Sequence, residues 1–83
     1  MKFKKINIEI NPNPSNGRFT IKLDQKKKGK IIVNNLLGFK VYELETELID
    51  SLELDLKNLK KDLYILSILL EDDQIISKRI IIY

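Results

Sequence analysis

Short runs in which apolar and polar residues alternate, separated by turn-forming residues, constrain this chain more than any other feature of its sequence. Alternation with a period of two places every second side chain on the same face, which is typical of a strand with one buried face. Two such runs open the chain, with Ile6, Ile8 and Ile10 in the first and Phe19, Ile21 and Leu23 in the second. Both runs predict strands, and the first ends at Pro12.

The segment between these runs, Pro-Asn-Pro-Ser-Asn-Gly at positions 12–17, predicts a firm turn. Pro12 and Pro14 have no amide hydrogen to donate, so neither can continue a paired strand. Asn16 and Gly17 favour a positive φ, which reverses the chain direction.

Further turns divide the middle of the chain. The lysine-rich residues 26–30 predict an exposed hairpin loop, because their like charges repel one another and Gly29 permits a reversal. A strand is expected over residues 31–33, followed by a second glycine-containing turn at residues 34–38. The next strand opens at Val41.

The end of the chain predicts a terminal hairpin. An apolar run over residues 64–70 is followed by a polar reversal at residues 71–73 and by an isoleucine-rich run over residues 74–83. The density of β-branched residues in the last run favours a strand with packing neighbours on both of its faces. A hairpin tip explains the acidic residues 71–73 better than a calcium site, because too few further oxygen ligands are implied.

The segment from residue 43 to residue 63 fits two structures. Its leucines recur at spacings of three and four, as on one face of a helix, and helix propensity agrees. Leu52, Leu54 and Leu56, however, alternate with charged residues, which is typical of a strand. The residues alone leave both structures open. Read as strand, this segment completes a set of six or seven short strands, which favours an all-β sandwich formed by one domain over residues 1–83.

The composition argues against catalysis and against several classes of partner. The chain contains no Cys and no His, so we expect no disulfide, no metal or cofactor and no histidine-activated nucleophile. A net charge of +3 is too small for the basic face of a nucleic-acid-binding domain. Basic residues open the chain, but the residues after them alternate and form neither the apolar core of a signal peptide nor a membrane span. We therefore expect a non-enzymatic, folded interaction domain.

Four motifs occur in a fixed order along the chain. They are P-N-P-S-N-G at positions 12–17, N-N-L-L-G-F-K-V at 34–41, L-D-L-K-N-L-K-K-D-L-Y-I-L at 54–66 and I-S-K-R-I-I-I-Y at 76–83. Together they resemble the C-terminal sorting domain of the type IX secretion system, which is carried by many secreted proteins of the Bacteroidetes. The resemblance covers nearly the whole chain from Ile8. It departs from the family at Asp62 and Asp73, where Gly is usual, although Asp tolerates left-handed backbone better than most residues.

This resemblance implies an immunoglobulin-like β-sandwich of about seven antiparallel strands, with a short loop or helical turn at residues 57–61. It implies a secretion signal that directs a passenger, fused on its N-terminal side, across the outer membrane to the cell surface or the exterior. In such families the passenger reaches the periplasm through its own signal peptide. There the translocon recognises the sorting domain, and a sortase-like peptidase commonly removes it at the outer membrane.

The candidate recognition residues fall in the two turns and in the last strand. They are Pro12, Asn13, Pro14, Gly17, Asn35, Gly38, Lys78, Arg79, Ile80, Ile81 and Ile82. A structural role also fits each of them, because rigid turns explain the first six and a closing strand explains the rest. Alternatively, the first loop is a preformed recognition surface, and the last strand offers main-chain groups and basic side chains to a receptor by strand addition.

Two other functions fit parts of the sequence. A generic immunoglobulin-like adhesion or carbohydrate-binding module would expose aromatic residues on one face, and besides a core Phe19 only Phe3, Phe39, Tyr42, Tyr64 and Tyr83 are available. A helix-containing interaction domain would place residues 43–63 as an amphipathic helix on a sheet. The lysine run is expected to be a solvated loop, although contact with anionic lipid surfaces is a further interpretation.

Overall fold

Seven β-strands form the described part of the chain. The computed structural model describes residues 7–24, 26–47 and 50–83, and Ile6, which was assigned to the first strand, lies outside them. The strands are β1 (Ile8–Asn11), β2 (Arg18–Leu23), β3 (Gly29–Asn34), β4 (Lys40–Thr46), β5 (Ser51–Asp55), β6 (Asp62–Leu70) and β7 (Ile75–Ile82). No helix occurs within these described ranges.

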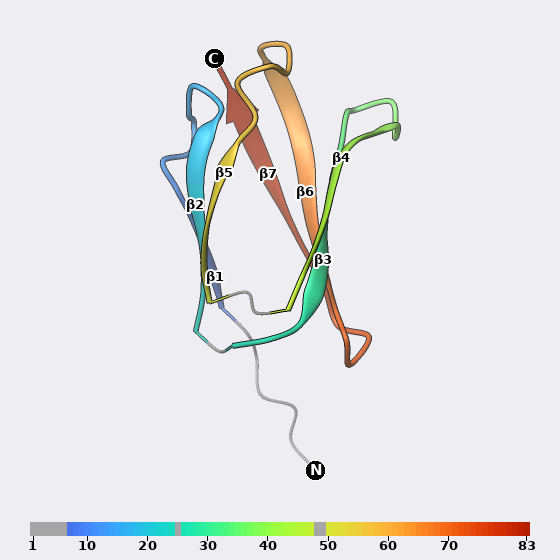
Figure 1. Cartoon of the computed structure of the whole chain (residues 1–83). Coiled ribbons are helices and arrows are strands. Elements are labelled where there is room, and N and C mark those ends of the chain that lie inside the picture. The colour runs from blue at the N-terminus through green and yellow to red at the C-terminus, as the bar shows by residue number, and fades with distance from the viewer. Residues whose placement is uncertain (1–6, 25, 48–49) are drawn as a thin grey trace.

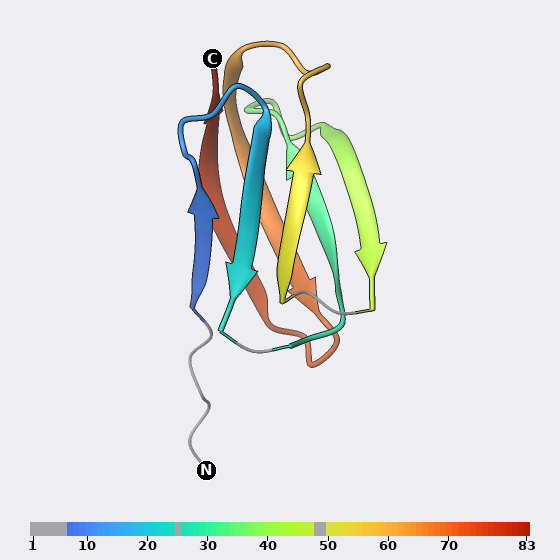
Figure 2. The same ribbon diagram turned by 60° about the vertical axis from the view of Figure 1, so that its left-hand side comes forward.

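The strands form two antiparallel sheets that pack face to face (Figures 1 and 2). One sheet has the order β1-β2-β5 and the other has the order β4-β3-β6-β7. This is the immunoglobulin-like β-sandwich that the family resemblance implied. The hairpin of β6 and β7 is confirmed, with Ser67 opposite Ser77 near its middle.

The core lies between the sheets and follows the alternation seen in the sequence. Phe19, Ile21 and Leu23 of β2 are all buried, while the residues between them face water or lie at its boundary. The other buried apolar residues are Ile31, Val33, Leu54, Leu56, Tyr64, Leu66, Ile68, Leu70, Ile80 and Ile82. Each large apolar side chain removed from water contributes about 1.5–3 kcal/mol, so this inner layer supplies the main driving force for folding.

The helical interpretation of residues 43–63 is wrong, and the strand interpretation is confirmed. Strand β4 continues to Thr46, β5 covers Ser51–Asp55 and β6 begins at Asp62, with a turn at residues 57–59. Leu52 and Leu54 lie opposite Ile21 and Phe19 of β2. The period of two therefore prevails over helix propensity, because it places these leucines against the apolar face of β2. Residues 48–49 lie outside the described ranges.

The expected hairpin loop at residues 26–30 is also wrong. Strand β2 pairs with β1 and β5, whereas β3 belongs to the other sheet, so the lysine-rich connection crosses between sheets. Gly29 and Lys30 are the first residues of β3 and do not form a turn. Both strands turn an apolar face toward the same core, β2 from one layer and β3 from the other.

Strand β7 does not pack on both faces as its isoleucine content predicted. It is an edge strand that pairs only with β6 in its sheet. Ile80 and Ile82 are buried, but 66% of Ile75 and 45% of Ile81 are exposed. The described residues place no layer over the outer face of this sheet, so Ile75 and Ile81 remain accessible to solvent.

Candidate functional site: the turn end of the sandwich

Three turns and the end of β7 gather at one end of the sandwich, which we call the turn end (Figure 1). The turns connect β1 to β2, β3 to β4 and β5 to β6. Strand β1 begins at the opposite end, so the described chain enters the sandwich far from these turns (Figure 2). The four motifs of the sequence therefore contribute to one region of the surface, although they are spread along the chain.

The β1–β2 loop, residues 12–17, covers the outer edge of β7. Asn13 Nδ2 donates to the Arg79 carbonyl oxygen at 2.9 Å, and the Ile81 amide donates to Asn13 Oδ1 at 3.0 Å. The Ser15 amide donates to the Ile81 carbonyl at 2.9 Å, and the Tyr83 amide donates to the Ser15 carbonyl at 2.9 Å. Ser15 also forms a parallel bridge with Ile82 and is only 2% exposed. The loop thus acts as a short additional strand on β7, and we call this contact the loop clamp.

Gly17 allows the same loop to approach β5. Its φ is 109°, and a Cβ atom there would lie 2.8 Å from both Cα and N of Lys57. The Leu56 amide donates to the Gly17 carbonyl at 2.7 Å, while the Gly17 amide donates to Ser15 Oγ at 3.1 Å. The loop therefore contacts the edge of one sheet and the end of a strand in the other.

Polar groups beside this contact fix the start of the β5–β6 loop. The Lys57 amide donates to Asp55 Oδ1 at 3.1 Å, and Arg18 Nε donates to Asp55 Oδ2 at 3.2 Å. The backbone hydrogen bond from Lys57, aided by Arg18, lowers the pKa of the Asp55 carboxyl below its usual value. At the far end of the loop, Tyr64 Oη donates to the Lys60 carbonyl at 2.6 Å, and burial raises the pKa of this phenol.

The β3–β4 turn is held by its own residues. Asn35 Oδ1 accepts hydrogen bonds from the Leu37 amide at 3.0 Å and from the Phe39 amide at 2.9 Å. The Asn35 amide donates to the Phe39 carbonyl, and the Gly38 amide donates to the Asn35 carbonyl. Gly38 has a φ of 89°, and a Cβ atom there would meet nothing within 4 Å. This turn therefore projects from the sheet.

The predicted recognition residues divide into exposed and buried groups. Pro12, Asn13, Pro14, Gly38, Lys78, Arg79 and Ile81 are exposed, and Asn35 is half-buried, whereas Gly17, Ile80 and Ile82 are buried. The main-chain groups of β7 that point away from β6 are already bonded to the loop clamp at Arg79, Ile81 and Tyr83. Side chains, not free main-chain groups, are thus what this part of β7 exposes.

Two residues of the turn end were not singled out from the sequence. Leu36 and Leu37 are 60% and 82% exposed on the β3–β4 turn, next to Phe39 at 66%. The available signal was the presence of large apolar side chains inside a turn, where the neighbouring strands cannot bury them. Their exposure places an apolar tip beside the Asn35 and Gly38 positions that the sequence did indicate.

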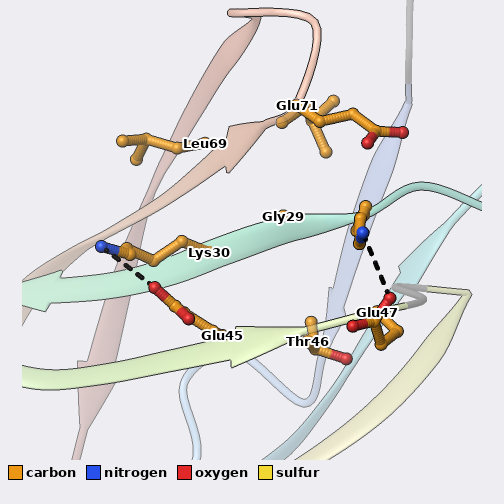
Figure 3. Close-up of a pocket in the computed structure, with 9 residues that line it drawn as sticks. Gly29, Lys30, Glu45, Thr46, Glu47, Leu69 and Glu71 are labelled. Atoms are coloured by element: carbon orange, nitrogen blue, oxygen red, sulfur yellow. Dashed lines mark ion pairs between the residues drawn. The ribbon is translucent and has the colours of Figure 1, made fainter.

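The opposite end carries a shallow hollow on the outer face of β4, β3 and β6 (Figure 3). Lys30 and Lys28 form ion pairs across it with Glu45 at 3.5 Å and Glu47 at 3.4 Å. Lys27 of the lysine run pairs with Asp72 at 3.5 Å. In the described ranges, no cluster of acidic, His or Cys side chains is suited to hold a metal ion, and no helix is long and apolar enough to cross a membrane.

The two aspartates that depart from the family pattern differ in conformation. Asp73 has a φ of 68°, the left-handed backbone that Gly would favour at this hairpin. Asp62 is not among the described residues with a positive φ, and its Oδ1 accepts a hydrogen bond from the Leu63 amide at 2.7 Å. The fold therefore accommodates Asp at both positions, with left-handed backbone only at Asp73.

Comparison with known proteins places this arrangement in a family. Residues 9–83 match the model of the secretion system C-terminal sorting domain. The ulvan lyase NLR42 of Nonlabens ulvanivorans is 33% identical over 76 residues, which cover 90% of this chain and 14% of that protein. This chain therefore spans a small part of the length of its relative. With a family match over nearly all described strands, the chain belongs to the C-terminal sorting domains of the type IX secretion system.

Proposed function

We propose that this chain works as a folded export signal whose turn end contacts the type IX secretion machinery. Sorting domains of this family direct export across the outer membrane to the cell surface or the exterior. In our proposal, residues 1–83 act as one domain attached behind a passenger, which crosses the periplasm before export. The domain itself performs no chemistry, consistent with a sequence that has neither His nor Cys.

The loop clamp is the observation that carries this proposal. It joins the P-N-P-S-N-G motif to the final strand through four hydrogen bonds, so two motifs far apart in sequence form one surface. The rigid loop lowers the ordering cost that a partner would otherwise meet on binding. A receptor would contact the exposed side chains of Pro12, Pro14, Arg79 and Ile81 on this surface.

Recognition by strand addition would require a different edge. The clamp occupies the outward main-chain groups of β7 from Arg79 to Tyr83, so an added strand would have to displace the loop. We propose that the translocon reads the clamped surface as it stands. A sortase-like peptidase at the outer membrane would then act outside the described fold, between passenger and domain.

The aromatic residues do not support the alternative function, that of an adhesion or carbohydrate-binding module. Tyr64 is part of the core, and Tyr42 packs against it. Phe39 and Tyr83 are exposed but belong to the β3–β4 turn and to the end of the chain. Within the described ranges, Phe39 and Tyr83 are therefore the exposed aromatic side chains, and neither belongs to the strand face of a sheet.

A reporter fusion tests the proposed function. The chain is placed behind a signal peptide and a fluorescent reporter in a type IX-competent bacterium and in a strain that lacks the translocon. We expect the reporter outside the outer membrane only in the competent strain. Retention in the periplasm of both strains, with the fusion intact and folded, would refute the proposal.

Exposed substitutions then test the turn end. Arg79→Ala with Ile81→Ser changes exposed side chains beside the clamp without removing a core residue, and it should reduce export. Ile75→Ser, on the same strand at the opposite end, is the matched control and should leave export unchanged. Equal export of all three chains would show that the clamped surface is not recognised.

A further inference from the structure

The β3–β4 turn places three large apolar side chains in solvent. Leu36, Leu37 and Phe39 are each exposed by 60% or more, and they lie within four consecutive positions. Single apolar residues are common on protein surfaces and need no explanation. A cluster of them instead marks a site of contact with another apolar surface, such as a membrane or a second protein. We call Leu36, Leu37 and Phe39 the apolar tip.

Backbone amides of the apolar tip form hydrogen bonds within the turn, which suits an environment with little water. The Leu37 and Phe39 amides donate to Asn35 Oδ1, the Gly38 amide donates to the Asn35 carbonyl, and the Phe39 carbonyl accepts from Asn35. Amides that are already bonded inside the turn need not lose hydrogen bonds to water when the turn leaves it. The tip therefore combines apolar side chains with internally bonded donors.

Basic side chains stand at the same end of the sandwich. Lys57, Lys60 and Lys61 are exposed on the β5–β6 loop, and none of them forms a side-chain ion pair with another described residue. The lysine run at the opposite end differs, because Lys27 and Lys28 are paired with Asp72 and Glu47. Three lysines without an ion pair thus lie at the same end as the apolar tip, whereas in the lysine run only Lys26 has no ion pair with another described residue.

We propose that the turn end binds the surface of a membrane that contains anionic phospholipid. Leu36, Leu37 and Phe39 enter the interface between head groups and acyl chains, and the β5–β6 lysines contact the lipid phosphates. A membrane is favoured over a protein pocket because one turn offers far less area than the roughly 800 Å² per partner of a stable protein interface. Interfacial binding has no such requirement, since apolar area and lysine charge add to one another. This proposal does not depend on the sorting function.

Vesicle flotation tests the proposal with the full chain. The probes are vesicles of phosphatidylglycerol with phosphatidylethanolamine, and vesicles of phosphatidylcholine alone. We expect binding to the anionic vesicles, weakening as salt is raised. Leu36→Ser with Leu37→Ser should lower the partition coefficient by roughly 10-fold or more, since two apolar side chains no longer enter the interface. Circular dichroism and a thermal melt confirm that each variant is folded.

Matched controls distinguish binding through the apolar tip from nonspecific adsorption to vesicles. Ile75→Ser removes an exposed isoleucine at the opposite end and should leave binding unchanged. Replacing Lys57, Lys60 and Lys61 with Gln should weaken binding to anionic vesicles by roughly 100-fold, because each lysine near such a surface contributes about 1 kcal/mol and every 1.4 kcal/mol is about tenfold. Replacing Lys26, Lys27 and Lys28 with Gln should have a smaller effect.

Several results would overturn the inference. One is that the unmodified chain binds neither kind of vesicle, and a second is that Ile75→Ser lowers binding as much as the tip variant does. If the tip variant lost export while the unmodified chain ignored vesicles, the tip would contact a protein and the membrane proposal would fall. Vesicle binding without export of the reporter would refute the proposed function but leave this inference intact.

Discussion

The β1–β2 loop and the β3–β4 turn use similar residues for opposite purposes. Each combines Asn side chains with a glycine at positive φ, Gly17 in the first and Gly38 in the second. The first is held by distant parts of the molecule through Ser15 and Asn13. The second is held by Asn35 within the turn itself. One turn therefore fastens the fold, and the other presents side chains to the surroundings.

The two glycines show the difference most directly. At Gly17 a side chain would be impeded by both the backbone conformation and the main chain of Lys57. At Gly38 only the conformation matters, because the surrounding space is open. The same residue type is thus required for close approach in one turn and for chain reversal in the other.

Gly17→Ala should give the largest effect. A Cβ atom 2.8 Å from Lys57 Cα and N forces the backbone of two loops apart, and the left-handed φ adds strain, so we expect a loss of about 3 kcal/mol or more. The free energy of unfolding in urea measures it. A loss below that of Gly38→Ala would contradict the close approach of the two loops.

Gly38→Ala supplies the comparison. With nothing within 4 Å of the added Cβ, only the left-handed backbone is costly, at about 1–2 kcal/mol. Nuclear magnetic resonance shifts should change near the β3–β4 turn and remain constant in β7. Changes that reached β7 would show that this turn is coupled to the rest of the sandwich.

Asn13→Ala tests the clamp without touching the core. It removes two hydrogen bonds to β7 main-chain groups, which we expect to lower stability by about 1–2 kcal/mol. Amide hydrogen exchange should become faster at Ile81. Asn16→Ala is the matched control, because, among the described residues, Asn16 Oδ1 accepts a hydrogen bond only from the nearby amide of Arg18, the first residue of β2. Faster exchange at Ile81 in the control would assign the effect to the loop as a whole.

Asn35→Ala is the corresponding test of the second turn. It removes the acceptor for the Leu37 and Phe39 amides, and because these groups are exposed and can bond to water, we expect a loss of about 1 kcal/mol or less. Exchange should accelerate at Leu37 and Phe39 and remain slow at Ile81. Accelerated exchange at Ile81 would show that the β3–β4 turn, like the β1–β2 loop, is coupled to β7 and is not stabilised by its own residues alone.

The sequence predicted the strands better than the contacts between them. Alternation located β1 and β2, and a continuous apolar run located β6, because both patterns need only neighbouring residues to be recognised. It could not show that residues 26–30 cross between sheets or that Ile75 and Ile81 face solvent, since both depend on which strands pair. The loop clamp was equally inaccessible, because it joins Asn13 to Arg79 and Ile81 across nearly the whole chain. The family resemblance identified the right residues for the turns, whereas the exposed tip needed the structure.

The smallest expected effect is on the pH dependence of stability, and it is tested by comparing Asp55→Asn with the unmodified chain. Asp55 lies at the end of β5, beside the loop that contains Gly17. Hydrogen bonds from the Lys57 amide and from Arg18 lower the folded-state pKa of Asp55 below the ordinary aspartate value of 3.8. The ionised carboxylate therefore adds stability that is complete above 3.8 and is lost as the pH falls through the lower folded-state pKa. The thermal midpoint of the unmodified chain should fall more steeply in that acidic range than that of Asp55→Asn. Because Asp55 is exposed, solvent screens the interaction and the difference should be small. Parallel curves for the two chains would show that the Asp55 carboxylate does not stabilise the loop that Gly17 contacts.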